Sequence, residues 1–104
     1  MAKRLEVLEN LTASGKADSF AWYALALEYK SSGRIGEALR TFEVLRTKAP
    51  GYVPGYQMAG SMLAAEGRVE DAKVWLQQGI EQATAVGNSH ACAEMQDMIE
   101  MIER

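Results

Sequence analysis

The sequence predicts an all-α protein of about six helices, and three observations lead to this fold class. The 104 residues include 16 alanines and many Leu, Glu, Met and Gln residues, all of which favour helix. No run of alternating β-branched residues and no Asn-Gly or Asp-Gly pair signals a hairpin. Two prolines and nine glycines divide the chain into intervals of helical length.

Composition excludes several classes of protein. With 48% apolar and 24% charged residues, the chain buries enough apolar surface to fold as one soluble domain. Its net charge of −3 does not favour nucleic acid as a partner, because polyanion binding needs a basic excess. The single cysteine cannot form an intramolecular disulfide, and no uncharged apolar run is long enough to cross a membrane. The first six residues lack the apolar stretch of a signal peptide, so we expect a cytoplasmic protein that does not bind membranes.

The sequence repeats itself at a period of 34 residues. Residues 32–38 align with residues 66–72, and both segments contain Gly-Arg at the same place. The same shift places Trp22 on Tyr56 and Phe42 on Leu76, so the size of the side chains is kept as well as their hydrophobicity. A period of this length is typical of stacked helix pairs.

On these residues the sequence resembles the tetratricopeptide repeat family, whose 34-residue pattern has Trp, Leu, Gly, Tyr, Gly, Ala, Phe, Ala and Pro at set positions. The first repeat, residues 19–52, matches with Trp22, Leu25, Ala26, Tyr29, Gly33, Ala38, Phe42, Leu45 and Pro50. The second, residues 53–86, matches with Tyr56, Ala59, Gly60, Leu63, Gly67, Ala72, Leu76 and Gly79, and has Thr84 in place of the closing proline. The resemblance implies an α-solenoid of antiparallel helix pairs that winds into a right-handed superhelix.

The elements follow in order within a single predicted domain, residues 1–104. Residues 3–13 form an N-terminal helix that corresponds to the second helix of a preceding repeat, and Asp18 caps the first helix of repeat one. Gly33 and Gly67 end the first helix of each repeat with positive φ. Residues 89–103 form a C-terminal capping helix with the apolar stripe Ala91, Met95, Met98 and Ile102.

Small residues are expected to bring the two helices of each repeat close together. Ala26 should face Ala38 in repeat one, and Gly60 should face Ala72 in repeat two. The larger apolar side chains on either side of these contacts would then fill the core.

Membership of this family would imply a non-catalytic protein–protein interaction module that binds a peptide or a partner helix in a concave groove. The implied groove residues are Phe20, Tyr23, Ala24, Leu27 and Lys30 in repeat one, and Gln57, Met58, Ser61, Ala64 and Ala65 in repeat two. Ala91, Met95 and Met98 of the capping helix would continue this surface. The lining is mostly apolar and lacks the Lys/Asn/Arg set that clamps a carboxylate in some members, so an apolar or amphipathic segment is the better partner.

Two alternatives stay open. The protein is either a binding module or a small structural homo-oligomer such as a dimer, whose groove is filled by its own C-terminal helix or by a second copy. Residues 1–52 carry eight basic and six acidic side chains, and residues 53–104 carry three and eight, so opposite ends of two copies could attract each other.

Candidate catalytic and metal-binding residues are few. His90 is the only histidine of the sequence and Cys92 the only cysteine. Because they are two residues apart on a predicted helix, their side chains point in different directions. The acidic residues Glu37, Glu70 and Asp71 lie where helices begin, and the helix dipole explains them. No catalytic residue, metal site or cofactor is predicted; an enzyme based on Cys92 is the third alternative, and it requires a reactive thiol.

Overall fold

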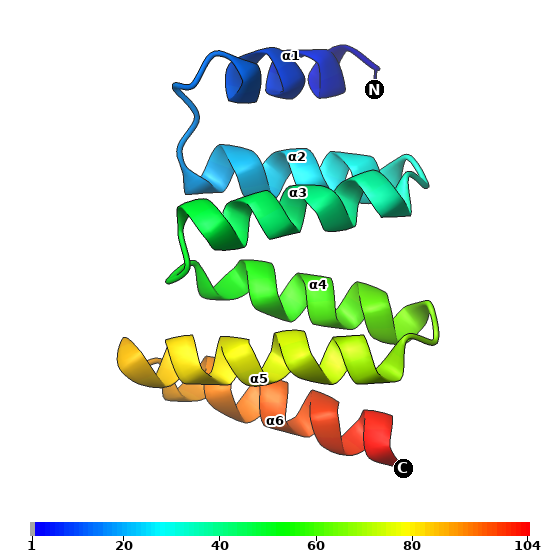
Figure 1. Cartoon of the computed structure of the whole chain (residues 1–104), viewed down its shortest axis with the longest axis vertical. Helices are drawn as coiled ribbons and strands as arrows, with labels where there is room; N and C mark the ends of the chain where they lie inside the picture. The colour runs from blue at the N-terminus through cyan, green and yellow to red at the C-terminus, as the bar shows by residue number, and fades with distance from the viewer. Residues whose placement is uncertain (1) are drawn as a thin grey trace. The chain divides into compact units, whose positions relative to one another are not determined.

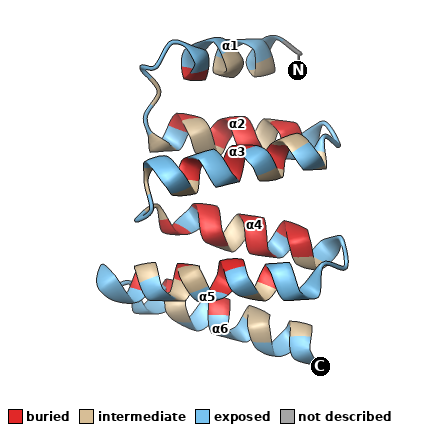
Figure 2. Ribbon diagram, viewed as in Figure 1, coloured by how far each residue is buried: buried red, intermediate tan, exposed pale blue. Residues whose placement is uncertain are grey.

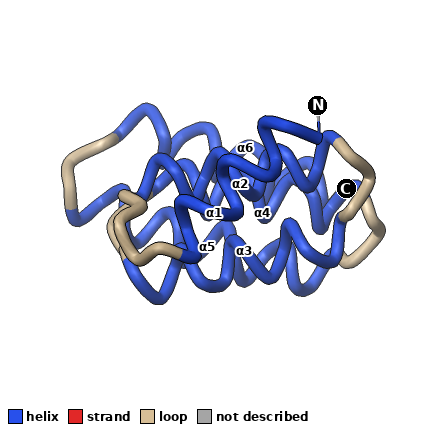
Figure 3. Tube along the Cα trace, turned by 90° about the horizontal axis from the view of Figure 1, so that it is seen from above, coloured by secondary structure: helices blue, strands red, loops and turns tan. Residues whose placement is uncertain are grey.

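The computed structural model describes residues 2–104, with the side chain of Ala2 left out; Met1, which the predicted domain includes, lies outside the described residues. Over this range the chain forms six helices and no strand, as the ribbon in Figure 1 and the trace in Figure 3 show, so the all-α prediction is confirmed. The helices are α1 (Ala2–Ala13), α2 (Ser19–Ser31), α3 (Ile35–Lys48), α4 (Val53–Ala65), α5 (Val69–Ala85) and α6 (Ser89–Glu103).

The chain divides into two compact units, Met1–Ala49 and Pro50–Arg104. Unit 1 contains α1, α2 and α3, and unit 2 contains α4, α5 and α6. Successive helices within each unit are joined by short turns. The expectation of a single domain over residues 1–104 stays a prediction.

The predicted helix ends are confirmed by their backbone geometry. The Asp18 carboxylate accepts a hydrogen bond from the Ala21 N–H at 2.9 Å and so caps α2. Gly33 and Gly67 have φ of 76° and 78°, the left-handed conformation in which a side chain is disfavoured. These glycines let the chain reverse direction directly after α2 and after α4.

The core of unit 1 lies between α2 and α3. Ala26 and Ala38 have no exposed surface, and Phe42 and Leu45 of α3 are almost completely buried with them (red in Figure 2). Helix α1 contributes less to this core than α2 and α3 do. Among the residues of α1 whose side chains are described, Thr12 alone is buried. Polar contacts with α2 supplement its packing.

Unit 2 has a core to which all three of its helices contribute. Gly60 of α4 lies so close to α5 that a Cβ atom there would be 2.6 Å from Leu76, which is fully buried. The expected partner of Gly60 was Ala72; Ala72 is fully buried, but the atoms nearest to Gly60 belong to Leu76, one helical turn later. Helix α6 adds Ala91 and Met95 to the same core.

Candidate partner-binding surface

The predicted partner-binding residues of unit 1 lie on α2. Phe20 is 66% exposed, so most of its side chain is accessible to a partner. Tyr23 and Leu27 are half-buried, and the Tyr23 ring meets the buried Phe42 ring edge-on with 6.1 Å between centroids. The helical spacing of these residues forms an apolar stripe that leads to the exposed Lys30.

Not all predicted lining residues of α2 are accessible. Ala24 is 8% exposed and belongs to the core, so its prediction as a lining residue is wrong. The physical reason is the narrow face of a helix: Ala24 is next to Leu25 and three residues from Ala21, and both of these are buried. The accessible stripe therefore consists of Phe20, Tyr23, Leu27 and Lys30.

The predicted partner-binding residues of unit 2 lie on α4. Gln57 and Met58 are half-buried and Ser61 is exposed, so all three retain some accessible surface. Ala64 and Ala65 continue this side of the helix. Met62, by contrast, is 3% exposed and fills the core, as is usual for methionine at helical spacing.

The structure overturns the prediction for α6. Ala91 and Met95 are buried in the core that α6 shares with α5, and Met98 packs against it, so these residues do not continue an open surface. The cause is the length of α5, which has 17 residues whereas α3 has 14. As a result α6 begins 36 residues after α4, not 34, and its sides are rotated relative to the simple repeat.

Counted from the first residue of each helix, Glu94 and Asp97 of α6 correspond to Met58 and Ser61 of α4. A contact agrees with this register: Gln57 Nε2 donates a long hydrogen bond of 3.5 Å to Glu94 Oε1. Two carboxylates were therefore missed as candidates. The signal that could have found them is Asn88, whose side chain accepts from the Ala91 N–H at 3.1 Å and marks the start of α6.

Ion pairs explain the acidic residues at the helix starts. Arg34 holds Glu37 through two hydrogen bonds of 2.5 and 2.7 Å, and this pairing lowers the pKa of Glu37 and raises that of Arg34. At the start of α5, Arg68 donates two hydrogen bonds, of 3.1 and 2.8 Å, to one carboxylate oxygen of Asp71. These carboxylates stabilise helix starts and need no functional role.

The side chains of His90 and Cys92 contact different residues. The His90 imidazole is 3.4 Å from Glu94, whereas the Cys92 thiol donates to the carbonyl oxygen of Ile80 at 3.7 Å and lies 3.4 Å from the Thr84 hydroxyl. Among residues 2–104 no group of three or more His, Cys, Asp and Glu side chains is placed to hold a metal ion. None of the helices described is long and apolar enough to span a bilayer.

Comparison with known proteins identifies the family. The chain is 35% identical to a tetratricopeptide repeat domain protein from Salinibacter ruber whose structure was solved by NMR. The two structures superpose with a TM-score of 0.79, and the match covers 83% of this chain and 87% of that one. A crystal structure of a tetratricopeptide repeat domain protein from the same organism gives 35% identity and a TM-score of 0.76, covering 83% and 97%. A protein from Bordetella parapertussis, 21% identical, shares the fold with a TM-score of 0.81 over 96% and 87% of the chains.

No family model matches the sequence, and neither does any curated protein. The likeness to the Salinibacter ruber protein is nevertheless sufficient: this chain belongs to the tetratricopeptide repeat family. Membership of this family indicates, in general, a protein–protein interaction module.

Proposed function

We propose that this protein is a non-catalytic interaction module that binds a peptide or partner helix in a mostly apolar concave groove. The predicted groove residues are Phe20, Tyr23, Leu27 and Lys30 in unit 1 and Gln57, Met58 and Ser61 in unit 2. The observation that carries the proposal is the stripe on α2, where Phe20 is 66% exposed beside the half-buried Tyr23 and Leu27. An accessible apolar stripe on a helix fixed by its own core loses little entropy when a partner binds.

The chemistry of the side chains on unit 2 adds a polar preference. Gln57, Ser61 and the two carboxylates Glu94 and Asp97 would favour a partner that carries a basic group in addition to apolar side chains. This agrees with the absence of a carboxylate-clamping Lys/Asn/Arg set from the sequence.

The test compares the proteins captured from cell extract by the wild type and by Phe20→Ser with Leu27→Ala. We expect the double variant to lose the principal partner, because the exposed ring and the neighbouring side chain supply the apolar contact. Val74→Ser with Val86→Ser is the matched control, since both valines are more than half exposed and lie outside the proposed groove. If the variant in α2 is folded and still retains every wild-type partner, this groove is not the binding site.

The polar preference has its own measurement. Glu94→Gln with Asp97→Asn should weaken binding of the captured partner and reduce its dependence on salt, because two interfacial charges are removed. Unchanged affinity and unchanged salt dependence would show that the partner does not contact this side of α6.

The alternative in which the C-terminal helix fills the groove has less support. The apolar side chains of α6 that could fill it, Ala91 and Met95, are buried against α5. A dimer formed through the groove is tested by sedimentation, since a protein that remains monomeric cannot fill its groove with a second copy.

We also propose that the protein has no catalytic activity and is cytoplasmic. Cys92 is half-buried and its thiol contacts Thr84 and Ile80. Alkylation of the folded protein should therefore be slow and limited by opening of the structure, whereas a rapid reaction would revive the enzyme hypothesis. Fractionation of cells that express the tagged protein checks its location.

A further inference from the structure

A surface groove in unit 2 lies outside the proposed binding residues. It has a volume of about 460 Å³ and is lined by Gln77, Ile80 and Glu81 of α5 and by Gln96, Ile99 and Glu100 of α6. Ile80 and Ile99 form its apolar part and join the core of unit 2 from this side. Glu81 and Glu100 are exposed, and neither forms an ion pair with another described residue.

The order of the helices explains what this groove lacks. In the pairs α2–α3 and α4–α5, the second helix packs on the first. It covers a small residue at the eighth position of the first helix, which is Ala26 in α2 and Gly60 in α4. Helix α6 occupies the place of a first helix, and its eighth residue is Gln96, which lines the groove. Among the helices of unit 2, none packs on this side of α6.

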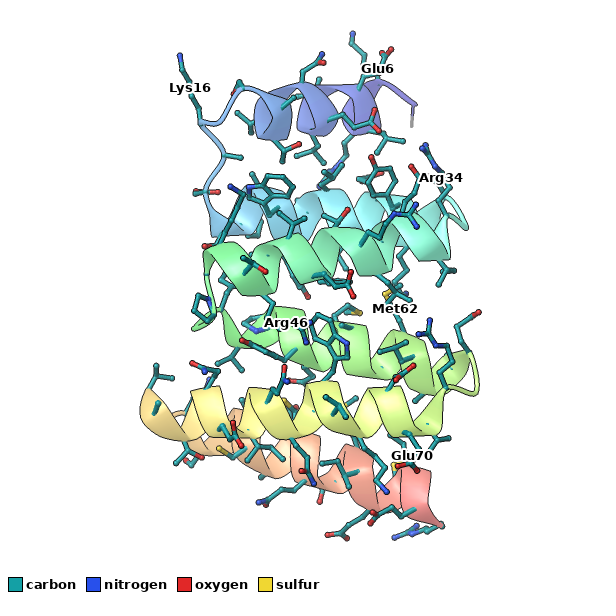
Figure 4. All side chains as sticks on the ribbon, viewed as in Figure 1. Glu6, Lys16, Arg34, Arg46, Met62 and Glu70 are labelled. Atoms are coloured by element: carbon teal, nitrogen blue, oxygen red, sulfur yellow. The ribbon has the colours of Figure 1, made fainter. Side chains whose placement is uncertain are left out.

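Helix α1 in turn has an outer side that no helix of unit 1 covers. It occupies the place of a second helix, and its main contact is with α2, which follows it. On its outer side Val7 is 58% exposed and Leu11 is 39% exposed, and Lys3 precedes Val7 by one turn. Figure 4 shows Glu6 and Lys16 projecting from this end of unit 1, away from α2.

We infer that α1 of a second copy docks in the groove between α5 and α6, so that copies associate head to tail. The two surfaces match in chemistry: Val7 and Leu11 would cover Ile80 and Ile99, while Lys3 would lie near the unpaired carboxylate of Glu100. Helix α6 carries four acidic side chains and no Lys or Arg, so the attraction extends beyond single pairs.

The direction of docking follows from the alternation of helices. Because successive helices in each unit are antiparallel, the incoming α1 would run antiparallel to α6. Its N-terminal turn, with Lys3, would then lie beside Glu100 at the C-terminal part of α6. Gln96 is larger than Ala26 or Gly60, so the docked helix packs less closely and the association is reversible.

An interface between two different surfaces has a consequence that an ordinary dimer lacks. Once two copies have docked, one α1 and one groove are still unused, so association continues beyond two copies and gives an open series. The experiment is sedimentation of the 104-residue chain at increasing concentration and at two salt concentrations. We expect species larger than a dimer at high concentration and dissociation in high salt.

Two charge-reversed variants test the surfaces separately. One carries Glu81→Lys with Glu100→Lys in the groove, and the other carries Lys3→Glu with Val7→Glu on α1. All four residues are exposed, so both variants should fold. Each alone should associate about tenfold more weakly or not at all, because like charges now face each other.

Mixing the two variants is the decisive step. The intact α1 of the first can dock in the intact groove of the second, so association should return in the mixture. Glu43→Lys with Glu66→Lys makes the same change of charge as the groove variant but lies away from both surfaces, and it should behave as the wild type.

Three results would overturn the inference. They are a wild type that stays monomeric up to about 1 mM, a closed dimer with no larger species, and association that neither variant weakens. These results are independent of the partner-capture experiment, because no residue of the proposed peptide groove is changed.

Discussion

The hydroxyl of Tyr29 donates a hydrogen bond of 2.6 Å to the carboxylate of Glu9, and this contact joins α2 to α1 across 20 residues of chain. Arg4 adds an ion pair to Glu28 at 2.7 Å. Arg34 lies 4.8 Å above the Tyr29 ring, so the same aromatic side chain also contacts the turn before α3. Tyr29 therefore does more than fill a core position of the repeat: its polar end holds the N-terminal helix.

Tyr29→Phe should weaken the attachment of α1 without disturbing the core. The variant loses a hydrogen bond to a charged acceptor, and we expect a loss of about 1–2 kcal/mol in the free energy of unfolding. Hydrogen exchange should increase mainly in α1. Glu6→Gln is the matched control on the same helix, because Glu6 is exposed and projects away from α2 (Figure 4). Equal exchange in wild type and Tyr29→Phe would contradict the proposed attachment.

Tyr29 also makes stability depend on pH at the alkaline end. Burial, followed by the hydrogen bond to Glu9 and the charge of Glu9, raises its pKa from 10.0 to about 12. The folded state thus holds this proton more tightly than the unfolded state. Its contribution is complete below pH 10 and is lost as pH rises toward 12.

Urea unfolding at pH 8 and at pH 11 measures this effect. Other groups titrate in the same range, so the informative quantity is the difference between wild type and Tyr29→Phe, which should show the smaller loss. Glu9→Gln should lower the pKa of Tyr29 only in part, because burial is the largest cause of the shift. Identical pH dependence in wild type and Tyr29→Phe would refute the assignment.

Gly60→Leu should destabilise unit 2. Even a Cβ atom at this position would lie 2.6 Å from the side chain of the fully buried Leu76, so a larger residue must push α4 and α5 apart. We expect a cost of about 1–3 kcal/mol or more, measured by thermal unfolding. Gly36→Ala is the control, since its Cβ would meet only Arg40, at 3.6 Å, and should be tolerated or stabilising. An unchanged melting temperature for Gly60→Leu would mean that the helix packing is wrong.

Gly79→Ala should disturb the docking of α6. The added Cβ would be 2.6 Å from the sulfur of Met95 and 2.7 Å from Cβ of Tyr56, and the second neighbour cannot move without the backbone of α4. We again expect a loss of about 1–3 kcal/mol. Combining it with Met95→Ala should cost less than the sum of the two single changes, because the space vacated by Met95 accepts part of the new methyl group. Strict additivity would show that the two residues do not interact.

Much of the fold could be predicted from the sequence because its signals are local. Asp18 and Gly33 act on backbone atoms within a few residues, so their roles as cap and as left-handed turn do not depend on distant parts of the chain. The match at 34 residues fixed the pairing of α2 with α3 and of α4 with α5, since small residues recur where the helices meet. Phe20, Tyr23 and Leu27 recur at helical spacing along α2 and each keeps accessible surface, while their role in partner binding stays a prediction.

The tertiary structure alone decided what depends on the contact between elements. Whether Met95 faces solvent or Gly79 depends on the start of α6, which comes two residues later than the 34-residue repeat predicts because α5 is longer than α3. A periodic pattern shows that a helix has an apolar side but not which neighbour covers it, because burial is a property of two surfaces together. For the same reason the sequence determined the family and the helix pairs, whereas the acidic side of α6 and the groove beside Ile99 emerged only from packing.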